Sequence, residues 1–190
     1  ISACLVGSEM CIRDREIPLE TPAVRLIGET AAVERARYML ALGAFTVAWS
    51  TLEYIFDLCI AIIYQRAPEG KSLDEVQPLA LSRKIRLFSR AHRQIDALKA
   101  RSEDASRIAS FMKEIGDIRH LIAHSVAVRS DSIGESHLRR MVPHKDGMRE
   151  MRADIETKDI AKLTTAITDR FAPLIAYCNF LAETFSDHTD

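Results

Sequence analysis

The sequence contains few glycine, proline and aromatic residues. Only 7 glycines and 6 prolines occur among its 190 residues, and phenylalanine, tryptophan and tyrosine together make up 6%. Glycine and proline interrupt regular elements and mark turns, so their scarcity favours a helical fold over a strand-rich fold with many turns. Hydrophobic residues reach 47%, which is enough for a sizeable core.

Cysteine is also scarce, and its pattern argues against disulfides and structural zinc. The chain has 4 cysteines and no CxxC spacing. Cys59 and Cys178 fall on apolar helical stripes, where a buried free thiol behaves as a small hydrophobe. Free thiols are typical of a reducing compartment, so the sequence predicts a cytoplasmic protein.

Long apolar runs and one-sided charge are absent as well. The most apolar segment, residues 41–64, is interrupted by Glu53 and Asp57, so we expect no membrane span. The formal net charge is −1, so the chain as a whole is not an obvious polyanion binder. The sequence has no P-loop, GxGxxG or GxSxG motif, which argues against the common nucleotide-triphosphate, dinucleotide and serine-hydrolase chemistries.

The N-terminal residues need separate treatment. Residues 5–14 resemble the translation of a transposon-end adapter used to build sequencing libraries, as in a chain assembled from metagenomic DNA. We therefore interpret residues 1–15 as an artefactual tail and give Cys4 and Cys11 no structural meaning. Residues 16–29 contain two prolines and no clear period, which predicts an extended lead-in. Residues 30–187 are expected to form a single helical domain.

Apolar residues elsewhere recur at intervals of three and four, the spacing of one helix face. Four segments show this pattern: residues 30–65, 78–100, 103–125 and 157–185. Gly43 is expected to bend or break the first helix, and Pro173 to kink the last. Alternating segments at 137–142 and 148–154 flank Asp146-Gly147, which favours a hairpin. The predicted fold is all-α: an antiparallel four- to five-helix bundle with a small β-hairpin or loop insertion before the last helix.

The main candidate site lies where the third predicted helix ends. Arginine binds phosphate oxygens in a bidentate fashion, and histidine exchanges protons near neutral pH. In a chain of this composition, random placement yields about two cases in which histidine follows arginine after four to six intervening residues. The spacing alone therefore does not identify a functional site. Three pairs occur: Arg119–His124, Arg139–His144 and Arg86–His92. Only Arg119–His124 lies at the end of a core-type helix, and only there does a second histidine, His120, directly follow the arginine.

The segment from Arg119 to His124 resembles the signature of the HEPN superfamily, and the order of predicted helices over residues 30–185 is similar too. The resemblance implies a compact helical domain, a homodimer, and a metal-independent endoribonuclease without cofactor that leaves a 2′,3′-cyclic phosphate. It implies that His124 is the acid or base, that Arg119 clamps the phosphate and that His120 supports them. It also implies a role in host defence or in a toxin–antitoxin pair, with an antitoxin or regulatory partner.

The geometry of a helix leaves the assembly of this site open. Five residues span about 140° of rotation, so Arg119 and His124 of one chain do not share a face. The helix can end irregularly, the long arginine can bridge the gap, or a second copy can complete the site across a two-fold interface. Asp117 and Glu53 are candidate supporting residues; the alternative for Glu53 is an intrahelical or capping partner.

Basic residues cluster on the second predicted helix. We expect five of them to contact RNA, although a solvated helix face explains them equally well. They are Arg83, Lys84, Arg86, Arg90 and Arg93.

Two other functions compete with the nuclease. Asp117, His120 and His124 are spaced i, i+3 and i+7, and Glu114 could add a carboxylate to a metal site on this helix. However, no second helix offers a clear ligand pair, so we predict no metal. The second competitor is a non-catalytic HEPN-like module that binds nucleotide or a protein partner.

Overall fold

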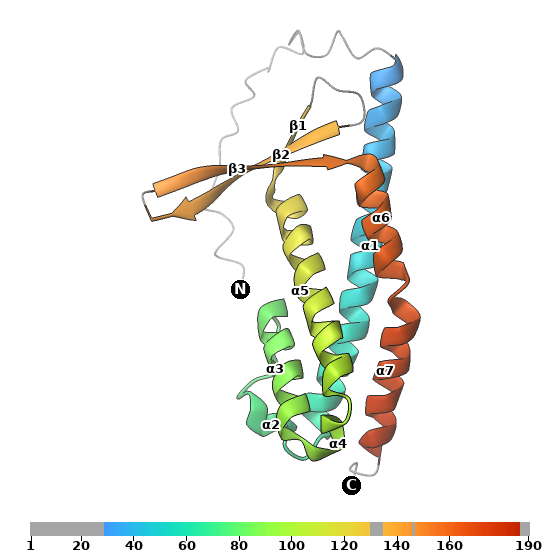
Figure 1. Cartoon of the computed structure of the whole chain (residues 1–190), viewed down its shortest axis with the longest axis vertical. Helices are drawn as coiled ribbons and strands as arrows, with labels where there is room; N and C mark the ends of the chain where they lie inside the picture. Colours follow the sequence, from blue (N-terminus) through green and yellow to red (C-terminus); the bar gives the residue numbers. More distant parts are fainter. Residues whose placement is uncertain (1–28, 130–134, 146, 187–190) are drawn as a thin grey trace, which may run out of the picture.

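The computed structural model describes residues 29–129, 135–145 and 147–186, and it confirms a mainly helical fold with a hairpin before the last helices (Figure 1). The predicted tail and the lead-in up to residue 28 lie outside the described residues. The elements are α1 (Glu29–Arg66), α2 (Gly70–Leu73), α3 (Leu81–Gln94), α4 (Asp96–Lys99), α5 (Ser102–His124), β1 (Val126–Arg129), β2 (Glu135–His144), β3 (Gly147–Glu156), α6 (Thr157–Thr168) and α7 (Phe171–Thr184).

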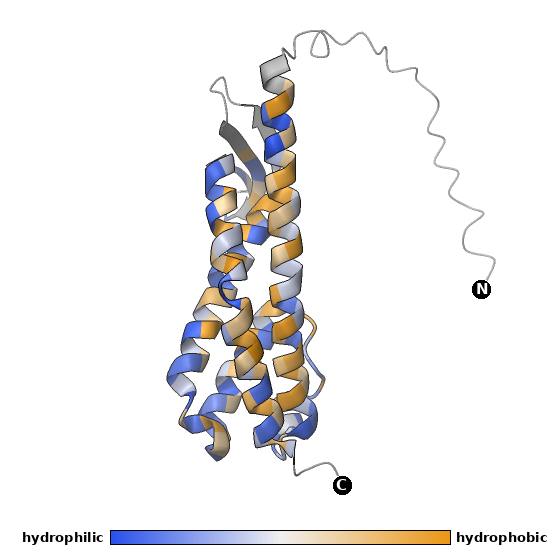
Figure 2. Cartoon of the chain, turned by 90° about the vertical axis from the view of Figure 1, so that its right-hand side faces the viewer, coloured by the Kyte–Doolittle hydropathy of each residue, from blue (hydrophilic) through white to orange (hydrophobic). Residues whose placement is uncertain are grey.

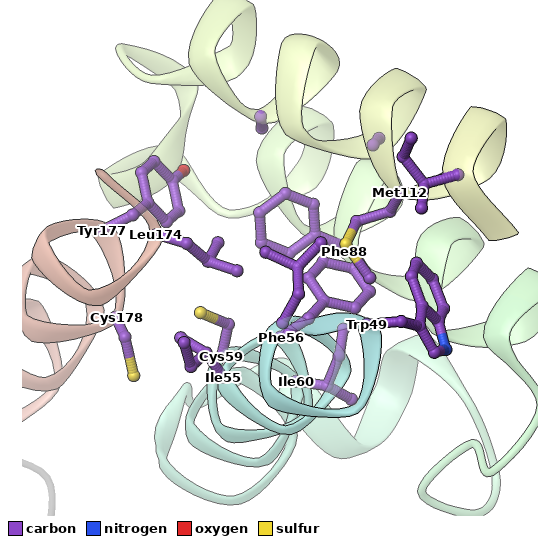
Figure 3. Close-up of a cluster of buried hydrophobic side chains, with 14 of the residues drawn as sticks. Trp49, Ile55, Phe56, Cys59, Ile60, Phe88, Met112, Leu174, Tyr177 and Cys178 are labelled. Atoms are coloured by element: carbon purple, nitrogen blue, oxygen red, sulfur yellow. The ribbon is translucent and has the colours of Figure 1, made fainter. Parts of the chain in front are cut away.

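Helix α1 is the central support of the fold. Its 38 residues span about 57 Å, and Gly43 does not break it. Helices α6 and α7 follow one another along α1, and α3 packs beside its C-terminal half (Figure 1). Trp49 and Phe56 point from α1 towards Phe88 of α3 and Met112 of α5 (Figure 3). Phe56 and Phe88 meet edge to face, with ring centroids 5.1 Å apart, in the middle of the core.

Helix α5 runs antiparallel to its neighbours, whereas α1 and α3 run in the same direction. The α1–α3 contacts advance together along both helices, from Glu53 with Lys84 to Phe56 with Phe88. On α5, Gly116 lies against Leu81 at the start of α3: a Cβ there would be 2.5 Å from the Leu81 side chain. The absence of a side chain at Gly116 therefore lets α5 approach α3 closely.

Two predicted long helices are interrupted. The second becomes α3 and α4, because the backbone at Ile95 is extended. The last becomes α6 and α7, with a break at residues 169–170. Pro173 therefore does not kink a continuous helix. It lies in the first turn of α7, where a backbone N–H has no intrahelical acceptor and its loss costs little.

The predicted hairpin is present and longer than expected. Strands β2 and β3 pair antiparallel from Glu135 with Glu156 to His144 with Gly147, and β1 adds a third strand on the other side of β2. Gly147 has a φ of 124°, a region that side chains disfavour, which explains glycine at this turn. Leu138 and Ile155 are buried at the bundle end of the hairpin, while its far end projects outward (Figure 1).

Candidate functional site

The arginine and histidines of the motif lie on the last turns of α5, next to the sheet. Arg119, His120 and His124 are all exposed, and so is Asp117. The helix ends at His124 because the backbone at Ser125 is extended and leads directly into β1. The predicted third helix and the location of the motif at its end are therefore confirmed.

The two imidazoles lie side by side. His120 and His124 are four residues apart on one helix face, and their ring centroids are 4.4 Å apart with planes inclined by 56°. Two exposed imidazoles at this distance can contact the same small anion. The structure thus places together the two residues of the motif that can exchange protons near neutral pH.

The surroundings of His120 lower the pKa of its imidazole. Desolvation is the largest cause of a lowered pKa at His120, and the charge of Arg140 on β2 is the next. His124 and Arg119 lower this pKa further, while Asp117 opposes them. His120 is therefore neutral, and able to accept a proton, at a lower pH than an ordinary histidine.

Arg119 does not share the face of the histidine pair. α5 stays helical through His124, so the irregular helix end considered for bridging Arg119 and His124 is absent. The sheet instead brings the positive charge of Arg140 close enough to lower the pKa of His120. Arg140 is distant in sequence and reaches this place through the pairing of β1 with β2, so no local spacing signalled it.

Glu53 lies in the seam between α1 and α3. Its carboxylate accepts a hydrogen bond from Trp49 Nε1 at 3.0 Å and lies 3.7 Å from Lys84 Nζ. Lys84 pairs more closely with Asp57, at 2.6 Å. These contacts support the alternative for Glu53, an intrahelical partner that also holds α3 against α1.

The basic residues of α3 divide into two sets. Lys84 is buried, with 7% of its surface exposed, so its predicted contact with RNA is wrong for this conformation: the inner face of α3 turns it towards Asp57. The remaining four recur on the outer face at helical spacing. Arg83 pairs with Asp74 at 2.7 Å, and Arg90 donates to the Leu73 carbonyl. The outer residues are Arg83, Arg86, Arg90 and Arg93.

A metal site on α5 is not assembled. Among the residues that the structure describes, no three histidine, cysteine, aspartate or glutamate side chains converge to hold a metal ion. Asp117 and His124 are seven residues apart, about 10 Å along the helix axis, which is too far for side chains of this length to share an ion easily. The structure therefore does not bring Asp117, His120 and His124 together as a metal site.

An apolar groove at the opposite end of α5 was not predicted. It measures about 530 Å³ and lies between α5 and α7 over Leu52 of α1. Its sides are mainly hydrophobic, and Arg101 and Arg170 lie over the rings of Phe180 and Phe111. The periodicity of apolar residues predicts which face of each helix is buried. It does not predict that α5 and α7 leave this groove between them.

Comparisons of the chain with protein-family models, with curated proteins and with solved structures find no match. Function is therefore inferred from the residues and from their geometry.

Proposed function

We propose that the chain is a metal-independent endoribonuclease whose site lies at the C-terminal end of α5. One observation carries the proposal: His120 and His124 form an exposed imidazole pair, 4.4 Å between ring centroids, and the positive charges of Arg140 and Arg119 act on His120. Two proton-exchanging groups beside positive charge are what phosphodiester cleavage within RNA requires. The HEPN-like motif supports the same assignment.

The chemistry needs no group beyond these side chains. A neutral imidazole removes the proton of the RNA 2′-hydroxyl, and the 2′-oxygen bonds to phosphorus as the bond to the 5′-oxygen breaks. A protonated imidazole gives its proton to that 5′-oxygen. The products are a 2′,3′-cyclic phosphate and a 5′-hydroxyl. The lowered pKa of His120 suits the proton acceptor, which leaves His124 as the donor.

Charge on the phosphorane-like transition state needs guanidinium groups. Within one chain the charges of Arg140 and Arg119 both act on His120, although Arg119 is rotated about 140° from His124. The family resemblance offers another arrangement, in which Arg119 of a second copy faces the histidines. The outer face of α3, with Arg86 and Arg93, can guide the RNA backbone towards either arrangement.

The test is cleavage of a structured RNA in EDTA. The intact chain should produce 2′,3′-cyclic phosphate ends, and His124→Ala and Arg119→Ala should each lose activity. Arg35→Ala, which removes an exposed arginine on α1, is the matched control and should cleave normally. Unchanged cleavage by His124→Ala would refute the mechanism.

A mixture of two inactive variants distinguishes a site formed within one chain from a site shared between two copies. If the site is shared between copies, Arg119→Ala mixed with His124→Ala restores part of the activity, because some dimers contain one intact composite site. If each chain works alone, the mixture stays inactive.

A second candidate function is RNA or nucleotide binding without cleavage. It is favoured by the exposure of Arg119, His120 and His124, because general acid–base catalysis gains from a site that excludes water. In this case RNA binding falls in Arg119→Ala and Arg140→Ala, and no variant or condition reveals cyclic phosphate ends.

A further inference from the structure

The outer face of α1 carries large hydrophobic residues that the bundle does not cover. Val33, Leu40, Val47 and Tyr54 are 46%, 74%, 67% and 64% exposed. They follow one another at intervals of seven residues over about 30 Å of helix. Leu58 extends the same face at 40% exposure. Scattered exposed hydrophobic residues are ordinary, but a continuous row along one face marks an interaction surface.

The spacing indicates what kind of surface contacts this face. Positions seven residues apart drift by only about 20° per interval on a straight helix, so the row stays on one face, and this interval is also the spacing at which a second helix packs in a coiled coil. Hydrophobic positions recur along α1 in Figure 2, and their burial divides them into an inner and an outer set. The inner set packs in the core, whereas the outer set has no partner among the described residues.

Gly43 gives a second, independent indication of a close neighbour. Glycine within a helix is unfavourable relative to alanine, so its presence needs a reason. No atom lies within 4 Å of a Cβ built at Gly43, so the bundle itself does not require the absence of a side chain there. Gly43 and Ala44 form a low point on the exposed face, which lets a neighbouring helix approach closely.

The row of exposed hydrophobic residues is symmetric about Gly43 and Ala44. Leu40 and Val47 lie equally far from the Gly43–Ala44 midpoint, and so do Val33 and Tyr54. A two-fold axis through the midpoint would place Leu40 of one copy against Val47 of the other, with Val33 against Tyr54 at both ends. We propose that two copies of this chain associate through the outer faces of α1, packed antiparallel and crossing at Gly43 and Ala44.

Charge supports the antiparallel direction. Arg37 lies beside the N-terminal end of the row and is exposed, and an ion pair with Glu34 at 2.7 Å offsets part of its charge. A parallel pair would bring the arginines of both copies to the same level, where like charges repel. The antiparallel pair places them at opposite ends of the interface.

This interface is separate from the proposed nuclease site. The inner face of α1 looks towards α5, since Leu52 and Met112 line the same groove, and the outer row points the other way. A dimer through α1 therefore leaves the two motifs apart on distant sides. It predicts that a mixture of Arg119→Ala and His124→Ala stays inactive, whether or not the intact chain proves to be a nuclease.

Other occupants of this face predict different outcomes. By length and composition alone, residues 32–66 of α1 would suffice to cross a membrane, although buried core helices also satisfy that criterion. Binding of the intact chain to phosphatidylcholine vesicles without dimerisation would overturn the proposal. A monomer at micromolar concentration in analytical ultracentrifugation would overturn it too.

Substitutions on the exposed row test the surface without disturbing the core. Leu40→Glu/Val47→Glu should convert the dimer to a monomer with unchanged helical circular dichroism. Leu79→Glu, at an 87% exposed leucine outside α1, is the matched control and should remain dimeric. A dimer that survives the double substitution would overturn the proposed surface.

Two further variants test the crossing point and the direction. Gly43→Leu fills the low point and should raise the dimer dissociation constant by about tenfold to a hundredfold. Leu40→Glu/Val47→Lys places opposite charges together only in an antiparallel pair, so it should dimerise more tightly than Leu40→Glu/Val47→Glu. Equal dissociation constants for these two double variants would overturn the antiparallel direction.

Discussion

The end of α5 and the outer face of α1 are both exposed, but they differ in chemistry. The first gathers imidazole and guanidinium groups, which water solvates well, so its exposure costs little. The second exposes Leu40 and Val47, whose contact with water is unfavourable. The polar cluster is therefore suited to a transient, charged ligand, whereas the apolar row calls for a lasting partner.

The largest expected effect concerns catalysis at the polar cluster. His124→Ala should lower the rate of RNA cleavage by about 10²–10⁴-fold, the usual contribution of a positioned acid or base. The dissociation constant of the α1 dimer should not change, because His124 lies outside that face. Single-turnover kinetics with sedimentation measurements on the same samples would check both. A loss of dimerisation in His124→Ala would contradict the separation of the two regions.

A second prediction contrasts the two sides of α1. Phe56→Ala should lower the free energy of unfolding by about 3–5 kcal/mol, because Phe56 is fully buried against Phe88. Tyr54→Ala, two residues away on the exposed row, should change it by less than about 0.5 kcal/mol. Urea denaturation should be compared in the monomeric Leu40→Glu/Val47→Glu background. A large loss in Tyr54→Ala there would mean that the outer face packs within its own chain.

A third prediction separates the buried and exposed cations of α3. Lys84→Met should destabilise the fold by about 1–2 kcal/mol, since it leaves Asp57 unpaired at a partly solvated seam. It should leave RNA affinity unchanged. Arg93→Ala should do the reverse, with weaker RNA binding and a smaller dependence on salt. Equal RNA affinities for Arg93→Ala and the intact chain would exclude this face from RNA binding.

The smallest expected effect is a shift in acidity. Arg140→Ala removes a positive charge that lowers the pKa of His120, so that pKa should rise towards the ordinary histidine value. Because the proton acceptor must be neutral, the acid limb of the cleavage profile should move to higher pH. NMR titration of His120 would measure the shift directly. An unchanged pKa would show that Arg140 does not act on this histidine.

Much of the secondary structure could be predicted because each signal is local. The spacing of Phe45, Trp49 and Leu52 by four and then three residues predicts α1, and Asp146-Gly147 between alternating segments predicts the hairpin. The breaks at Ile95 and Arg170 were missed, because the apolar stripe continues across both. The helical periodicity of apolar residues indicates which face is buried, but it does not indicate where the helix ends.

The candidate site was predictable only in part. The location of Arg119, His120 and His124 at a helix end follows from sequence, as does the adjacency of residues four apart. The burial of Lys84 could not be predicted, because the sequence gives this lysine the same exposed position as the four neighbouring arginines. Only the folded structure shows that it pairs with Glu53 and Asp57.

By itself, the sequence determined the helices, the hairpin and the imidazole pair, because hydrophobic period, turn residues and i, i+4 spacing act over a few residues. Only the tertiary structure decided that the charge of Arg140 acts on His120, that Lys84 is buried, and that Leu40 and Val47 stay exposed. Those outcomes depend on strand pairing and helix packing between distant segments. Such contacts follow from the free energy of the whole core and not from any one stretch of chain.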